Sequence, residues 1–104
     1  MNTRNRLPNR RPAETIEFER DGIRVTMTVG YMPGGSAGEV FLNTDHSNSM
    51  LDVLLSDAAI IASLLLQYGC PLPEIAHALK RDRFGIAASP IGAAIDRITR
   101  PEVT

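Results

Sequence analysis

The side chains most able to carry chemistry are one thiol and two imidazoles, Cys70, His46 and His77. A redox cysteine pair needs a second thiol, and a nucleophilic thiol needs a neighbour that lowers its pKa. A structural zinc site takes four ligands in paired spacing, which these three residues lack. We therefore expect no catalytic residue, no metal site and no cofactor bound by this chain itself. Cys70 is interpreted as a small apolar residue in a corner between helices.

Basic residues form two short groups. The first twelve residues hold four arginines and no acid, a net charge of +4, whereas the remainder carries −5. A second group surrounds Asp82. The planar guanidinium of arginine suits phosphate and carboxylate groups, but a solvated tail and helix-end electrostatics explain the same charges. The candidate ligand-binding or partner-binding residues are Arg10, Arg11, Lys80, Arg81 and Arg83.

The first half of the chain has the pattern of β-strands. Apolar and polar residues alternate over 23–31, and shorter alternations cover 14–20 and 39–43. A period of two with β-branched residues is typical of strands with one buried face. Asp21-Gly22 between the first two runs favours a type I′ turn. These features predict a three-stranded antiparallel β-meander.

The second half has the pattern of helices. Residues 50–68 predict a long apolar helix with a candidate N-cap among residues 47–49 and a stop at Gly69. Its polar residues form one narrow stripe, namely Asp52, Ser56, Ser63 and Gln67, and Asp57 stands just outside it. Two shorter helices are predicted over 71–81 and 89–97. The fold class is α+β: a three-stranded antiparallel β-meander followed by a long apolar helix and two short helices.

The long helix is too apolar to be covered by so few elements. We expect Leu65 to lie in the core and the chain to form a homodimer. Residues 1–12 are predicted to be a basic extended arm, 13–99 a single α+β domain and 100–104 a frayed tail. A single cysteine and a polar start favour the cytoplasm, and the apolar run 58–66 is too short to span a membrane.

Two motifs carry a resemblance to a known family. They are Gly38-Glu39-Val40-Phe41-Leu42 and Ser63-Leu64-Leu65-Leu66-Gln67-Tyr68-Gly69. Together with matches from Leu7 to Phe84, they resemble the TSCPD module near the C-terminus of adenosylcobalamin-dependent ribonucleotide reductases. The resemblance implies a link to ribonucleotide reduction and deoxyribonucleotide synthesis. It implies adenosylcobalamin for the full-length reductase, not for this chain.

The chain departs from the family in one place. The family takes its name from a cysteine-bearing motif late in the domain, and the corresponding stretch, Arg83–Pro90, has no cysteine. Reduction in that family uses a cysteine radical and a reducing cysteine pair, which one cysteine does not provide. The family name implies a ribonucleoside-diphosphate reductase, but this departure and the missing catalytic domain predict that the chain is inactive by itself.

Three functions follow as hypotheses. The first is a non-catalytic accessory domain that docks on a reductase or binds nucleotide phosphate. The second is a generic homo-oligomeric binding module without a reductase link. The third is a nucleic-acid contact through the arginine arm, which the acidic body and the scarcity of aromatic residues disfavour.

Overall fold

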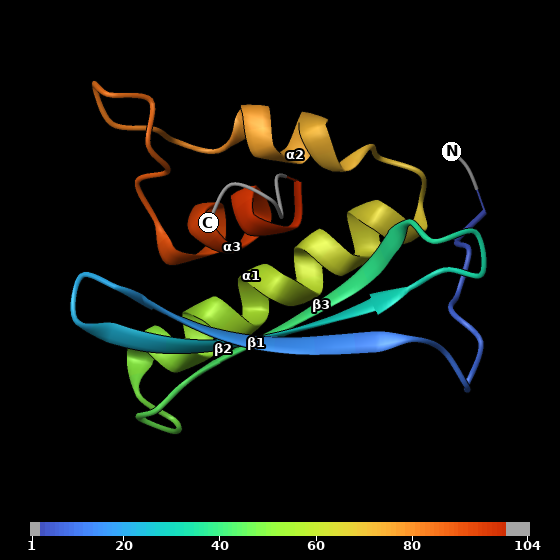
Figure 1. Cartoon of the computed structure of the whole chain (residues 1–104), viewed down its shortest axis with the longest axis horizontal. Coiled ribbons are helices and arrows are strands. Elements are labelled where there is room, and N and C mark those ends of the chain that lie inside the picture. Colours follow the sequence, from blue (N-terminus) through green and yellow to red (C-terminus); the bar gives the residue numbers. More distant parts are fainter. Residues whose placement is uncertain (1–2, 100–104) are drawn as a thin grey trace.

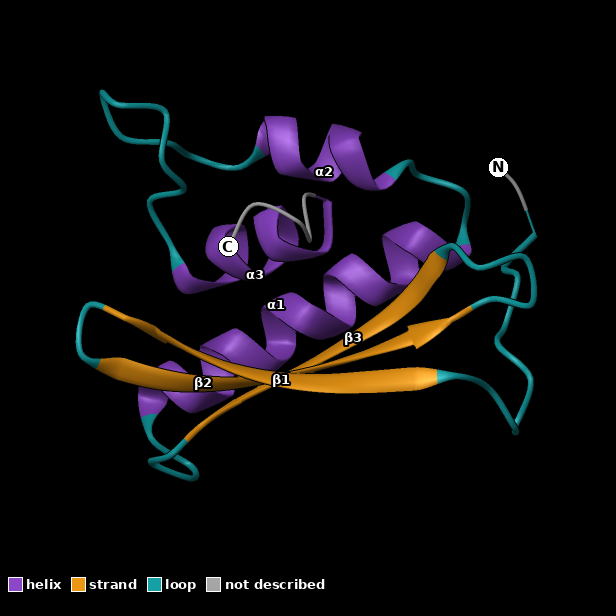
Figure 2. Ribbon diagram, viewed as in Figure 1, coloured by secondary structure: helices purple, strands orange, loops and turns teal. Residues whose placement is uncertain are grey.

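The structure, a computed structural model, describes residues 3–99. Over this range the chain forms a three-stranded sheet followed by three helices, which confirms the α+β prediction (Figure 2). The predicted tail, 100–104, lies outside the described residues. The elements are β1 (Ala13–Arg20), β2 (Ile23–Tyr31), β3 (Ala37–Thr44), α1 (Met50–Gln67), α2 (Leu72–Ala78) and α3 (Pro90–Thr99).

The sheet is an antiparallel meander in the order β1-β2-β3. Arg20 pairs with Ile23, so only Asp21 and Gly22 form the first turn. Both have the left-handed conformation, with φ of 53° and 81°. These are the angles that a type I′ turn requires, and the turn matches the twist of the strands it joins. The Asp-Gly prediction is confirmed.

The core lies between one face of the sheet and the helices. Its strand residues are Phe18, Val25, Met27, Val29, Val40 and Leu42. They pack against Leu55 and Ala59 of α1 and Ala94 of α3, and Figure 1 shows the helices layered on this side of the sheet. The sequence prediction for Leu65 is wrong, because this side chain is 43% exposed. The inward face of α1 belongs instead to the smaller residues Ala59 and Ala62 and to Leu55.

The polar stripe of α1 faces the outer edge of β3. Four of its side chains bond to β3 backbone groups that have no strand partner. The Thr44 amide donates to Asp52 Oδ1 at 2.7 Å, and the Val40 amide donates to Ser63 Oγ at 2.8 Å. Ser56 Oγ donates to the Leu42 carbonyl at 3.1 Å, and Gln67 Nε2 donates to the Gly38 carbonyl at 3.0 Å. The stripe thus takes the place of a fourth strand.

Local capping sets the ends of α1. Of the three candidate N-caps, Ser49 is the one used, since its side chain accepts from the Asp52 amide. At the other end Gly69 has φ of 97°, and the Cys70 amide donates to the Leu65 carbonyl at 2.9 Å. This is a Schellman ending with glycine at C′, as predicted.

The two short helices differ from their predicted bounds. α2 ends at Ala78 because Leu79 takes an extended conformation, with ψ of 152°. The chain then enters an isolated bridge between Arg81 and Ala87, which a continuing helix would prevent. α3 continues two residues beyond the prediction, to Thr99.

By length and composition alone α1 is able to cross a membrane, with a mean hydropathy of 1.7 over 18 residues. The sequence analysis considered only the run 58–66, which is too short to span a membrane, whereas the whole of α1 is long enough. Core helices of soluble proteins meet the same criteria of length and composition. Insertion into lipid would detach the polar stripe from β3 and leave the edge of the strand unpaired. The packing in this structure therefore favours a helix that belongs to the domain.

Replacement of Leu55, which is 4% exposed, with alanine tests the core assignment. We expect Leu55→Ala to lower the free energy of unfolding by about 2–5 kcal/mol, because a buried cavity is created. Ile86→Ala is the control, since that side chain is exposed and its loss should cost at most ~0.5 kcal/mol. Urea denaturation measures both, and equal losses would contradict the assignment.

The Asp52 carboxyl should make the free energy of unfolding depend on pH in the acid range. Hydrogen bonds from the Thr44 amide, and next from the Asn48 amide, hold the pKa of its carboxyl below the usual value. The unfolded state then binds the proton more readily, so this stabilisation is complete above about pH 4 and is lost as pH falls through the lower folded pKa. Asp52→Asn should remove this part of the pH dependence in urea denaturation between pH 5 and 2. If the difference in free energy of unfolding between the two proteins is the same at every pH in that range, the prediction is wrong.

Candidate functional site

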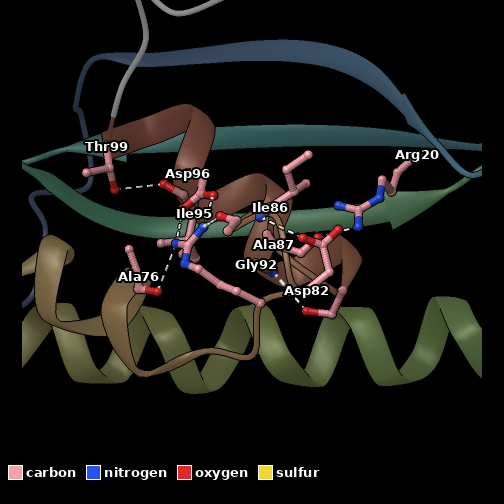
Figure 3. Close-up of polar contacts among 12 residues, drawn as sticks. Arg20, Ala76, Asp82, Ile86, Ala87, Gly92, Ile95, Asp96 and Thr99 are labelled. Atoms are coloured by element: carbon pink, nitrogen blue, oxygen red, sulfur yellow. Dashed lines mark hydrogen bonds and ion pairs between the residues drawn. The ribbon is translucent and has the colours of Figure 1, made fainter.

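A loop leaves the body of the domain between α2 and α3 (Figure 1). It is closed by backbone bonds from Asp82 N to Ile86 O at 2.8 Å and from Ala88 N to Lys80 O at 2.9 Å. The Asp82 carboxylate accepts from the Phe84 amide at 2.8 Å. It also accepts from the Ile86 amide at 3.0 Å (Figure 3). These bonds make residues 80–88, here called the 80–88 loop, a small hairpin held by its own aspartate.

Two arginines fasten the 80–88 loop to the domain. Arg81 forms a two-pronged ion pair with Asp96 of α3, with both N–O distances 2.7 Å, and also donates to the Ala76 carbonyl at 3.0 Å. Hydrogen bonding to Asp96 raises the pKa of the Arg81 guanidinium. Arg20, at the end of β1, donates to the Ala87 carbonyl, and Ala87 is buried (Figure 3). The base of the loop is thus fixed from both sides.

The tip of the 80–88 loop presents large apolar side chains to solvent. Phe84 is 72% exposed and Ile86 is 57% exposed. The Arg83 guanidinium stacks on Phe84, 4.8 Å from the ring centroid. Phe and Arg on a pre-ordered loop bind a protein surface with little entropy loss. The tip thus combines exposed apolar side chains with a cation on a hydrogen-bonded loop.

The N-terminal arm, described here from residue 3, contacts the body of the domain. The Asn5 amide donates to the Gln67 carbonyl at 2.7 Å. Arg11 forms an ion pair with Glu39, whose side chain lies directly over Gly30. A side chain at position 30 would collide with that carboxylate, so the ion pair depends on this glycine.

The five predicted binding residues do not form one surface. The segment with Arg10 and Arg11 and the 80–88 loop lie at opposite ends of the molecule (Figure 1). Arg11 and Arg81 are held in ion pairs, while Arg10, Lys80 and Arg83 are exposed. Their binding role stays a prediction for each end separately.

Sequence reasoning missed the presentation of Phe84 and Ile86 by this loop. The available signal was the turn pattern Asp82-Arg83-Phe84-Gly85, with the aspartate and glycine that tight turns favour. Gly85 takes the left-handed conformation with φ of 81°. The ion pair of Arg81 with Asp96 had no comparable signal, because the two residues belong to different elements.

Cys70 lies partly buried beside Ile75 and Ala76, in the corner between α1 and α2, as the sequence predicted. Within residues 3–99 the structure places no three His, Cys, Asp or Glu side chains where they could hold a metal ion.

Comparison with known proteins identifies the family. The profile of the TSCPD domain matches residues 2–99. The chain belongs to the TSCPD domain family. This TSCPD domain is 33% identical over 81 residues to the vitamin B12-dependent ribonucleotide reductase of Agrobacterium fabrum, which covers 78% of the chain and 6% of the reductase.

Two further relatives have the same name. The vitamin B12-dependent ribonucleotide reductase of Bradyrhizobium diazoefficiens is 33% identical over 84 residues, covering 81% of this TSCPD domain and 7% of the reductase. The reductase of Rhodopirellula baltica is 31% identical over 81 residues, covering 78% of this TSCPD domain and 8% of the reductase. The chain thus spans less than a tenth of these relatives. No solved structure matches it.

Proposed function

We propose that this TSCPD domain is a non-catalytic accessory domain of ribonucleotide reduction and docks on a ribonucleotide reductase through the 80–88 loop. The observation that carries the proposal is the exposure of Phe84 and Ile86 on a loop whose base is fixed by Arg81 and Arg20. Large apolar side chains gain free energy when they leave water, and a fixed loop loses little entropy on binding.

Homology supports the choice of partner. The matching segment forms 6–8% of the vitamin B12-dependent reductases, so in those proteins the domain is joined to a large catalytic body. A domain with the same fold and its own recognition loop is suited to contact such a body in trans. In this proposal the catalysis and the adenosylcobalamin belong to the reductase, and both proteins act in the cytoplasm.

The alternative of nucleotide-phosphate binding has weaker support. The N-terminal segment that contains Arg10 and the 80–88 loop that contains Lys80 and Arg83 lie at opposite ends of the molecule (Figure 1). These cations therefore cannot all converge on one phosphate group. Arg83 is also engaged with the Phe84 ring. We therefore assign these loop cations to the rim of a protein contact, where they influence orientation and association rate.

The test is calorimetric titration of the intact chain with the purified adenosylcobalamin-dependent reductase encoded by the same genome. Combined replacement Arg83→Ser and Phe84→Ser should weaken binding at least about tenfold, as expected for truncated hot-spot residues. Arg10→Ser is the matched control and should leave the affinity unchanged, because it removes one exposed arginine at the far end.

Two results would overturn the proposal. One is absence of binding between the intact chain and the reductase. The other is equal affinity for the intact chain and the loop variant. A parallel titration with a nucleoside diphosphate separates the alternatives, because binding of the nucleotide without binding of the reductase would replace docking with phosphate recognition.

A further inference from the structure

α1 exposes a row of side chains, all but one of them apolar and here called the apolar row, on the side opposite its buried residues. The row runs through positions 50, 54, 57, 61, 64 and 68, so its steps alternate between four and three residues. This is the spacing by which one helix packs along another. The apolar members, all exposed, are Met50, Leu54, Ile61, Leu64 and Tyr68.

Asp57 is the one acid in this row. It is exposed and, within residues 3–99, forms no hydrogen bond or ion pair. A helix laid on the apolar row would also cover Asp57. Covering a carboxylate is costly unless a cation meets it. The occupant of this face must therefore be apolar with a positive charge at one defined position.

Arg4 supplies such a charge on the same chain. Its Nε donates to Gln67 Oε1 at 2.6 Å, and its side chain lines a hollow of about 270 Å³ together with Ile60, Ser63 and Leu64. Arg4 thus lies beside the apolar row, level with its C-terminal half. Among the described residues it forms no ion pair.

We propose that a second copy of this chain covers the row, with the two α1 helices antiparallel about a two-fold axis level with Ile60 and Ile61. Asp57 lies ~5 Å along the helix before this level. The α1 residues that line one hollow with Arg4, at positions 60, 63, 64 and 67, are centred ~5 Å after it. The axis therefore brings Arg4 of each copy level with Asp57 of the other. A parallel pair would instead place the two Asp57 carboxylates at the same level.

A groove supports the same arrangement. The C-terminal part of α1 and the start of α2 enclose an open, apolar groove of about 660 Å³, lined by Ile61, Leu65, Tyr68 and Pro71 among others. Leu54 and Leu65 are eleven residues apart, which is three helical turns, so both lie on one flank of α1. In the antiparallel pair, Leu54 of one copy lies over the groove of the other. The contact is thus self-complementary, as a two-fold interface requires.

Charge reversal provides the test, with sedimentation velocity over a concentration series as the measurement. The intact chain should be a dimer. Arg4→Glu and Asp57→Arg should each weaken self-association at least about 30-fold, because each places two like-charged pairs in the contact. An equimolar mixture of the two variants should dimerise again, since a heterodimer has opposite charges at both pairs.

Matched controls are Arg10→Glu and Glu17→Arg, which make the same charge changes at exposed positions away from α1 and should leave the dimer intact. Ile61→Arg should sediment as a monomer, and its circular dichroism spectrum should show that it is folded. A monomeric intact chain would overturn the proposal. So would dimers unaffected by either charge reversal, or failure of the mixture to associate, and each of these results is independent of reductase binding.

Discussion

The outer edge of β3 is the constraint on which the rest of the structure depends. A strand at the end of a sheet has backbone groups without a strand partner, and in this chain a helix meets them instead of water or another strand. The polar stripe of α1 bonds to β3 from the Gly38 carbonyl to the Thr44 amide. Each of these bonds fixes the rotation of α1 about its own axis.

That rotation determines which surfaces remain for function. With the polar stripe directed at β3 and Leu55, Ala59 and Ala62 directed at the core, the apolar side chains on the opposite side of α1 must face outward. An apolar row with a central carboxylate then needs a partner of matching chemistry. The 80–88 loop is fixed separately, through Asp96 and the Ala87 carbonyl, so the two surfaces can serve different partners at once.

Local signals in the sequence predicted the elements well, whereas contacts between distant elements had no such signal. The Asp21-Gly22 turn and the glycine at the end of α1 follow from backbone conformation alone, and both are confirmed. The sequence showed the polar stripe of α1 but not which surface the stripe faces. A stripe that bonds to the edge of a strand has the same spacing as one that faces water. The error at Leu65 has this origin. The docking of Arg11 on Glu39 is equally nonlocal, since it depends on a glycine in the neighbouring strand.

Native-state hydrogen exchange of the β3 amides tests the central claim most directly. The Val40 and Thr44 amides donate to side chains of α1, so they should exchange slowly, at rates close to those of global unfolding. The Glu17 amide provides the internal reference, because it points outward from β1, the other edge of the sheet, and should exchange rapidly. If Val40 and Thr44 exchange as fast as Glu17, α1 does not hold the edge of β3 and the account is wrong.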